Sequence, residues 1–419
     1  MKPMLFSALF CLLYLTTIAQ DIQEFVTKNL TPISNIDTAS NDYNDLEPIG
    51  TAIGNARIVM LGEQDHGDAP TFLAKTRLIK YLHERKGFNV LAFESDFYGL
   101  TTGWENTRKT PDSIYKFLRE NIYSLWTSSD ACNYLFKEYI PGTFKTGQAL
   151  NISGFDPQVS LAYSHANLKN DLTAYISTHH LKEKFTGDST YEKFLVALQE
   201  LVGQQRSVKV FGNDERRSIL QNGLSLLKEN TSDTSYWRTI IDNLVDYNNN
   251  SNETRDKRMS LNLKYVVNGK YRNEKVIVWA ANTHIIRYTD RITSNKKRLK
   301  GIIFENMGTG FTNDPQFTKD TYILGFASYE GSAGRLGSRI YKLLPPEKKG
   351  FENWIPENVK FGFVDFKKYN QAFNTPDNAF LMKAPSHFTI PGNVAKIPWN
   401  LVYDGVFYIR EMYPVKRLE

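Results

Sequence analysis

The chain has 419 residues, of which 41% are hydrophobic and 23% are charged, a balance typical of globular proteins rather than of disordered ones. The formal net charge of +6 is spread along the sequence, and its densest basic run, residues 295–300, is interpreted as a solvated loop rather than a nucleic-acid patch. The two cysteines, Cys11 and Cys132, exclude a cysteine metal site.

Residues 1–20 have the composition of a secretory signal. Lys2 precedes an apolar run from Met4 to Leu15, and small residues follow near Ala19, as in cleaved signal peptides. The apolar run is too short to span a bilayer comfortably. The sequence therefore predicts a bacterial protein that is exported to the periplasm or secreted, without stable membrane insertion after cleavage and without an intramolecular disulfide.

The first part of the remaining chain predicts a βαβ unit. After a short helix at 21–31, residues 57–61 form an apolar run of the kind found in buried parallel strands. Apolar residues then recur at helical spacing over 70–86, and Gly87 ends that helix before a second strand at 88–93. We expect the two strands to be parallel neighbours or near-neighbours, because a helical crossover joins them.

The rest of the chain predicts further strands with many helices between them. Helices are expected at 111–121, 127–139, 165–178, 190–205, 213–229 and 233–267, the last one interrupted by the polar run at 248–252. Strands are expected at 149–155, 276–280, 301–304, 322–327, 361–366 and 402–409. The predicted fold is α/β, with a mixed, largely parallel sheet flanked by helices. A helical insertion at about 160–265 interrupts a single catalytic domain over 21–419.

Ionisable side chains follow four of the predicted strands where each strand ends. Glu63 and His66 follow the first strand, Glu94 ends the second, Asp156 ends the third and His284 follows the fourth. Ligands of open α/β sheets bind beyond the carboxyl ends of the parallel strands. These five side chains are therefore expected to converge on one crevice.

Each of these residues also has a purely structural interpretation. Glu63 could cap the following helix, and the two histidines could lie in loops without a chemical role. A buried carboxylate such as Glu94 needs a partner, which Lys75 or Arg77 could supply. Asp156 lies in Gly-Phe-Asp-Pro, which is also an ordinary turn. The joint pattern, rather than any one residue, favours a functional site.

His66 is the natural general base, because histidine is the side chain whose ordinary pKa lies nearest neutrality. Glu63 or Glu94 could orient its ring, as the carboxylate does in a triad, and His284 or a cation could stabilise an oxyanion. No Gly-x-Ser-x-Gly elbow is present, so a serine nucleophile of the usual α/β-hydrolase type is not supported. The loop also differs in spacing from the helical His-Glu-x-x-His zinc motif.

These motifs resemble those of the erythromycin esterase family. The family's Gly-Glu-x-x-His-Gly loop corresponds to residues 62–67, and the resemblance covers roughly residues 45–412. The other matching motifs follow in the family's order: Lys86-Gly87-Phe88, Ala92-Phe93-Glu94, Leu125-Trp126-Thr127, Gly154-Phe155-Asp156, Arg255-Asp256-Lys257-Arg258-Met259, the stretch from Val278 to His284, Met307-Gly308 and Tyr403-Asp404-Gly405-Val406.

The resemblance implies an esterase that hydrolyses the lactone of macrolide antibiotics such as erythromycin and so gives macrolide resistance. Water would be activated directly on a histidine, without an acyl-enzyme and without a cofactor. The expected catalytic group is His66, Glu63, Glu94 and His284, with His284 or Lys75 stabilising the oxyanion. The expected contacts with the macrolide or another small ester are Lys75, Arg77, Asp156, Arg255 and Asn282.

Two positions depart from the family pattern and leave alternatives open. Ala281 stands where the family usually has His, and Lys75 stands where it commonly has Arg, which would offer a planar fork of donors. One alternative is a metal-dependent hydrolase or peptidase of a related fold acting on another exported substrate. The four catalytic candidates offer carboxylate and imidazole ligands that suit a divalent metal. The other alternative is an exported binding protein without catalysis.

Overall fold

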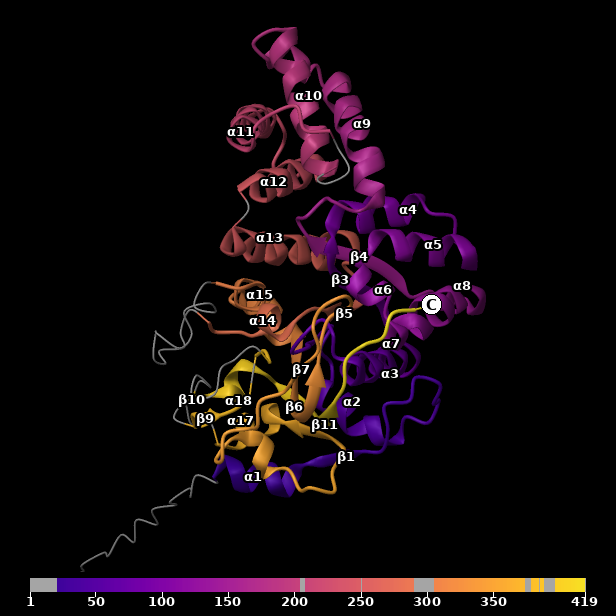
Figure 1. Cartoon of the computed structure of the whole chain (residues 1–419), viewed down its shortest axis with the longest axis vertical. Coiled ribbons are helices and arrows are strands. Elements are labelled where there is room, and N and C mark those ends of the chain that lie inside the picture. Colours follow the sequence, from indigo (N-terminus) through magenta and orange to yellow (C-terminus); the bar gives the residue numbers. More distant parts are fainter. Residues whose placement is uncertain are drawn as a thin grey trace, which may run out of the picture.

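The computed structural model describes residues 21–203, 208–249, 251–289, 305–373, 378–383, 385–387 and 396–418. The signal segment expected at 1–20 and the strand expected at 301–304 lie outside these residues. The described chain folds around a nine-stranded sheet with the order β1-β8-β11-β6-β2-β5-β3-β4, and β7 pairs with β6 beside this path. Helices flank the sheet, and a further group of helices extends from one end of the molecule (Figure 1).

The core of the sheet is parallel. Its parallel strands are β2 (Ile58–Leu61), β3 (Phe88–Asp96), β4 (Asn151–Asp156), β5 (Lys275–Trp279), β6 (Thr321–Ala333) and β11 (Gly405–Met412). Antiparallel pairs add β8 (Phe361–Asp365) to β11, β1 (Thr31–Ile33) to β8, and β7 (Tyr341–Lys342) to β6. A separate ladder joins β9 (Phe380–Leu381) to β10 (Lys396–Ile397). The predicted mixed, largely parallel sheet is confirmed.

The first βαβ unit is also confirmed. β2 and β3 both pair with β5, so they are near-neighbours on either side of it. They are joined by α3 (Ala69–Lys86), which carries a proline in its first turn and ends at Gly87 in the left-handed conformation with φ +74°. A glycine adopts that conformation without the steric cost that other residues meet.

The central strands are apolar because both of their faces are covered. In β2, Val59 and Leu61 belong to the hydrophobic cluster that includes Phe72 of α3. Ile58 and Met60 point the other way and belong to the cluster on the opposite face. Side chains alternate along a strand, so a parallel strand between two layers of helices is apolar throughout.

Most of the remaining helices flank this sheet. They are α1 (Ile22–Asn29), α2 (Glu47–Ile53), α4 (Trp104–Asn106), α5 (Pro111–Asn121), α6 (Ser124–Thr127), α7 (Asp130–Asn133), α8 (Ile140–Thr146), α14 (Asn282–Ile285), α15 (Met307–Thr312), α16 (Pro315–Asp320), α17 (Phe366–Phe373) and α18 (Trp399–Val402). The expectation of one helix over 127–139 is wrong. The C-terminal tail bonds there to the backbone of Ser128 and Asp130, which interrupts the helix between α6 and α7.

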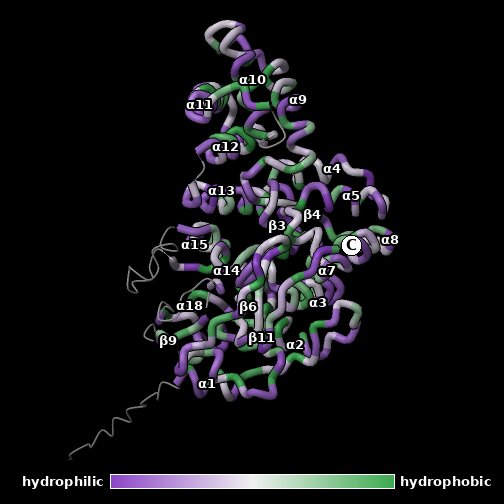
Figure 2. The backbone as a smooth tube through the Cα atoms, in the orientation of Figure 1, coloured by the Kyte–Doolittle hydropathy of each residue, from purple (hydrophilic) through white to green (hydrophobic). Residues whose placement is uncertain are grey.

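Five helices lie between β4 and β5 in the chain. They are α9 (Ala162–Thr178), α10 (Asp188–Gly203), α11 (Asn213–Glu229), α12 (Tyr236–Asn249) and α13 (Asn252–Tyr265). The first four form a lobe above the sheet (Figure 1) with its own apolar cluster, and hydrophobic and hydrophilic residues alternate along them (Figure 2). α13 packs on α12, β4 and α15 and so lies between the lobe and the sheet.

No described helix combines the length and apolar character needed to cross a membrane.

Candidate active site

The loop that follows β2 is held close to its neighbours. At Gly62 an added Cβ would lie 1.9 Å from Oδ1 of Asn282, so no larger residue fits there. The buried Asn282 side chain accepts from the backbone N–H of Phe326 and donates to the carbonyl of the same residue, at 3.1 and 2.8 Å. The backbone N–H of Asn282 donates to the carbonyl of Glu63 at 2.8 Å. Asn282 therefore ties this loop to β6, and its expected role as a substrate contact stays a prediction.

Glu63 and His66 form a pair at the end of β2. Nδ1 of His66 lies 2.7 Å from Oε1 of the buried Glu63. Since an ionised carboxylate only accepts hydrogen bonds, this contact places a proton on Nδ1. Nε2 of His66 has no hydrogen-bond partner among the described residues, and 16% of the side chain is exposed. Nε2 is therefore the ring nitrogen that is open to the cleft.

Two further donors complete the surroundings of Glu63. Nζ of Lys75 donates to Oε2 at 2.8 Å, and the indole N–H of Trp126 donates to Oε1 at 3.1 Å. The ammonium lies 4.1 Å from the centre of the Trp279 ring and is fully buried. Burial lowers the pKa of Lys75, while the charge of Glu63 opposes this effect. In this position Lys75 contacts Glu63 and Trp279, and its expected contact with substrate or an oxyanion stays a prediction.

A second cluster lies at the ends of β3 and β4. Arg255 on α13 donates through Nη2 to Glu94 at 3.0 Å and to Asp156 at 2.5 Å, and its Nε lies 3.2 Å from both Asp156 oxygens. The other Glu94 oxygen accepts from the backbone N–H of Ala281 at 3.0 Å. Glu94 therefore pairs with Arg255, rather than with Lys75 or Arg77. Nη1 of Arg255 makes no hydrogen bond to a described residue.

His284 lies between two carboxylates. Its Nδ1 is 2.7 Å from Asp256 and its Nε2 is 3.2 Å from Glu94. Burial alone would lower the pKa of His284, but the charges of Glu94 and Asp256 and their hydrogen bonds outweigh it and raise the pKa to about 10. Burial likewise works against the ionised form of Glu94, yet His284 and Arg255 hold its pKa well below the ordinary value.

His284 is therefore an imidazolium at neutral pH, with both N–H groups already donated to carboxylates. It contributes positive charge to the cleft but has no free donor to aim at an oxyanion, which corrects one of the two roles expected for it. Asp256 holds this arrangement together, since it also accepts from the backbone N–H of Met307 at 3.0 Å.

Arg77 lies away from these clusters. Its guanidinium donates to Asp45 at 2.7 and 3.0 Å and to the backbone carbonyls of Asn35 and Asp42. It holds the segment before α2 against α3, and its expected role as a substrate contact stays a prediction.

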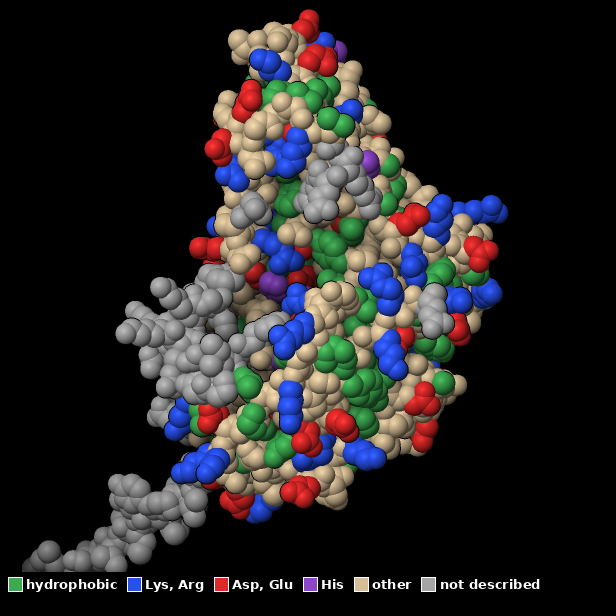
Figure 3. Space-filling model, in the orientation of Figure 1, with side chains coloured by type: hydrophobic (Ala, Val, Ile, Leu, Met, Phe, Trp, Pro, Cys, Tyr) green, Lys and Arg blue, Asp and Glu red, His purple; other side chains and the backbone are tan. Residues whose placement is uncertain are grey.

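The other expected residues do converge at the carboxyl ends of the parallel strands. Glu94 lies close enough to His66 for the two side chains to interact electrostatically. Glu94 also bonds to Arg255 and His284. Figure 3 shows a hollow below α13 where acidic, basic and histidine side chains meet. The residues that lie in one cleft are His66, Glu94, Arg255 and His284. Glu63 lies beneath His66, and Asp156 lies beneath Arg255.

Three residues of this site carried no assigned role in the sequence. Asp256 and Trp126 were visible only as members of motifs that resemble the family's, because nothing in the spacing shows which neighbour they bond. Tyr123 donates to Gln158 at 2.8 Å and lies 3.4 Å from Asp156. Its ring is 6.2 Å from that of Trp126. In the sequence, a lone tyrosine before a helix does not indicate that its side chain will lie in the site.

The back of the Gly62–Gly67 loop is fixed by later parts of the chain. Asp65 accepts from Arg335 at 2.6 Å and from the hydroxyl of Tyr341 at 2.9 Å. Asp68, just beyond the loop, pairs with the buried His387 at 2.9 Å. The carboxylates that are not in the cleft thus hold the loop that presents His66.

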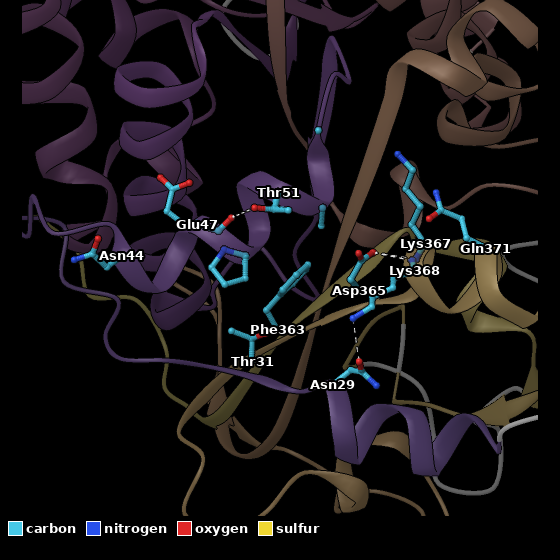
Figure 4. Close-up of a pocket in the computed structure, with 13 residues that line it drawn as sticks. Asn29, Thr31, Asn44, Glu47, Thr51, Phe363, Asp365, Lys367, Lys368 and Gln371 are labelled. Carbon is cyan, nitrogen blue, oxygen red and sulfur yellow. Dashed lines mark hydrogen bonds between the residues drawn. The ribbon is translucent and has the colours of Figure 1, made fainter.

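Across the described ranges, no group of three or more His, Cys, Asp and Glu side chains is arranged to hold a metal ion. A pocket of about 660 Å³ lies elsewhere (Figure 4), between α2 and the start of α17. It includes Asp365, which pairs with Gly405 at the first position of β11, and so lies at the amino ends of the parallel strands. The pocket is separate from the cleft around His66.

Comparison with known proteins identifies relatives that cover most of the chain. The putative hydrolase YbfO of Bacillus subtilis (strain 168) is 26% identical over 325 residues, which cover 71% of this chain and 70% of the relative. The erythromycin esterase type II of Escherichia coli is 23% identical over 420 residues, which cover 88% of this chain and 93% of the relative.

Solved structures share the fold. A succinoglycan biosynthesis protein superposes with a TM-score of 0.68 at 17% identity, covering 95% of this chain and 98% of its own. A mutant of the erythromycin esterase EreC in its open conformation superposes with a TM-score of 0.57 at 16% identity, covering 91% and 97%. A family model described as erythromycin esterase matches residues 83–411, a span that includes Glu94, Arg255 and His284. The chain therefore belongs to the erythromycin esterase family, whose members are hydrolases.

Proposed function

We propose that this chain is an exported esterase that opens the lactone ring of a macrolide by water activated on His66. The observation that carries the proposal is the Glu63–His66 pair. Glu63 holds the proton on Nδ1 at 2.7 Å, and Nε2 faces the cleft without a partner among the described residues. This is the arrangement that a general base needs before it takes a proton from water.

The reaction can be written with this chain's own residues. Nε2 of His66 takes a proton from water as the oxygen attacks the lactone carbonyl carbon. The bond between that carbon and the ring oxygen then breaks, and the imidazolium returns its proton to the leaving alkoxide. The products are a carboxylic acid and an alcohol on one opened chain, one water heavier than the substrate.

Arg255 is the group best placed to meet the negative charge that develops on the carbonyl oxygen. Its Nε and Nη2 are held by Asp156 and Glu94, while Nη1 has no partner among the described residues and 22% of the side chain is exposed. A donor that is already oriented stabilises an oxyanion without reorganising during the reaction. His284 adds positive charge behind Glu94.

The family and the position of the helical lobe support a macrolide as the substrate class. The E. coli relative is an erythromycin esterase by name, and a macrolide is a large and mostly apolar ring. The helical lobe and α13 stand over the strand ends (Figure 1), so they can form one wall of a cleft for a ligand of that size. The aromatic side chains of Tyr123 and Trp126 lie beside the reacting histidine.

The test is incubation of the purified protein with macrolides of differing ring size, with and without exhaustive chelation, followed by mass spectrometry. A gain of one water at the lactone, kept after chelation and absent for His66→Gln, is the expected result. No mass gain with any macrolide or simple lactone would contradict the proposal. Activity that disappears on chelation and returns with a divalent metal would favour the metal-dependent alternative.

A further inference from the structure

The cleft contains two histidines that bond to carboxylates, and only one of them is free to accept a proton. His284 lies between Glu94 and Asp256, and these two charges outweigh burial and raise its pKa to about 10. At neutral pH it is already protonated. A buried carboxylate beside His66 would favour the imidazolium form in the same way, and the other partners of Glu63 decide how strongly it does so.

Glu63 accepts hydrogen bonds from two donors besides His66. Its Oε1 accepts from Trp126 at 3.1 Å as well as from His66 at 2.7 Å, and its Oε2 accepts from Lys75 at 2.8 Å. A cation and an additional N–H on the same carboxylate offset its negative charge. Glu63 therefore stabilises an imidazolium less than Glu94 and Asp256 together do.

Both donors to Glu63, Lys75 and Trp126, are buried. The Lys75 side chain is fully buried, and Trp126 is 1% exposed. Burial lowers the pKa of Lys75, while Glu63 favours its positive form. The face of Trp279, with its centre 4.1 Å from the ammonium, also favours the cation. The Trp126 ring meets the His66 ring edge-on, with centroids 5.5 Å apart, so Trp126 fixes the ring as well as the carboxylate.

We propose that Lys75 and Trp126 are positioning residues that keep His66 as the proton acceptor of the site by neutralising and orienting Glu63. The proposal rests on the proposed function, in which His66 is the general base. It adds two buried residues: Lys75 acts through Glu63, and Trp126 acts through Glu63 and through its edge-on contact with the His66 ring.

Other charged groups near His66 are already paired. Asp65 accepts from the backbone N–H of His66 at 2.8 Å, but its charge is bonded to Arg335. Glu94 is bonded to Arg255 and His284. Burial raises the pKa of the Cys132 thiol well above its ordinary value, so this neighbour of Glu63 and Lys75 is neutral. None of these groups can replace the charge of Lys75 on Glu63.

The test is the proton uptake of His66 itself, followed by NMR on protein labelled in its histidine rings. The His66 signals are assigned by their loss in His66→Gln, and the pH midpoint of their titration is compared between parent, Trp126→Phe and Lys75→Met. We expect the midpoint to rise by about one pH unit in Trp126→Phe and by more in Lys75→Met, because a hydrogen bond to a charge is worth this much.

Trp104→Phe is the matched control. Trp104 is also buried, and its indole N–H donates to Asn151 at 3.5 Å, with no contact to Glu63. Its removal should leave the His66 midpoint unchanged. The conservative variant Lys75→Arg, which keeps the charge, should stay closer to the parent than Lys75→Met.

A folded Trp126→Phe protein with the parent midpoint would overturn the role of Trp126, and the same result in Lys75→Met would overturn that of Lys75. If Lys75→Met fails to fold, Trp126→Phe against Trp104→Phe decides. The titration needs no substrate. A protein that shifts as expected yet hydrolyses no ester would therefore overturn the proposed function and leave this inference standing.

Discussion

At the residue scale, the site separates a base from a fixed cluster of charge. His66 has one carboxylate partner and one free nitrogen, whereas both nitrogens of His284 are bonded to carboxylates. Arg255 is held by two of its nitrogens and leaves the third for a ligand. Residue types alone would allow either histidine to be the base, and their hydrogen bonds favour His66 for this proposed role.

Replacing His66 by Ala should lower kcat/KM for a hydrolysed lactone by about 10²- to 10⁴-fold, the usual contribution of a general base. The side chain is partly exposed and is not part of the apolar core, so the melting temperature should change little. Ester hydrolysis followed by mass spectrometry, together with circular dichroism melts, measures both effects. Full activity in this variant would refute the assignment.

The His284 cluster predicts how stability depends on pH. The folded pKa of His284 is raised from 6.5 to about 10, so its contribution is fully present below about pH 6.5 and is lost as the pH rises through about 10. Urea denaturation of the parent should show stability falling across this window. The His284→Gln variant should show a flatter profile there, and equal slopes for the two proteins would contradict the buried imidazolium.

At the scale of elements, short polar bonds fix the strand ends to one another. Asn282, at the start of α14, bonds to both backbone groups of Phe326 in β6 and to the carbonyl of Glu63 after β2. Gly62 leaves the space that the Asn282 side chain fills. The position of the catalytic loop is thus set by an element more than 200 residues away in the chain.

Replacing Asn282 by Ala should destabilise the protein by about 2–4 kcal/mol, because two buried backbone groups of Phe326 lose their partners. The loop would also shift, so kcat should fall more than KM rises. Denaturant titration and steady-state kinetics test this. An unchanged stability would show that Phe326 finds other partners.

For Arg77 we expect a substitution to lower stability without lowering activity. Arg77→Met removes bonds to Asp45 and to two backbone carbonyls near the N-terminal segment. It should lower the melting temperature while leaving kcat and KM near the parent values. A large rise in KM with an unchanged fold would support Arg77 as a substrate contact.

At the scale of the whole molecule, the C-terminal end of the described chain supports the site. The C-terminal residues run from the catalytic loop, where Val415 bonds to the carbonyl of Gly67 at 2.9 Å, to α7, where Asp130 bonds to the carbonyl of Lys416 at 3.0 Å. Arg255 and Asp256, adjacent on α13, connect the helices above the cleft to strands β3 and β4 and to His284. The cleft is assembled from segments spread over the whole sequence.

Truncation after Met412 should therefore impair both stability and catalysis. It removes the tail bonds to Gly67 and Ser128, so the carbonyls of these two residues lose the backbone donors Val415 and Leu418. Thermal melts and lactone hydrolysis should both decline relative to the full chain. A truncated protein that melts and reacts as the full chain does would show that the tail is dispensable.

Much of the fold was predictable from local patterns. The apolar runs at 57–61 and 276–280 predict buried strands because a parallel strand with two covered faces has no polar side, and β2 and β5 occupy these places. Helical spacing predicts α5 and α11 at their observed bounds. The break at 128–130 was not predictable, because it depends on a tail nearly 290 residues later.

The sequence by itself determined that Glu63, His66, Glu94, Asp156 and His284 follow strands and would meet at one edge of a sheet, because parallel strands end together. Only the tertiary structure decided which groups each of these side chains contacts at that edge. Whether a histidine is a base or a fixed cation depends on how many carboxylates surround it and how those are neutralised. Such contacts, like that of Lys75 with Glu63 or Arg77 with Asp45, are made in space and leave no pattern in the order of residues.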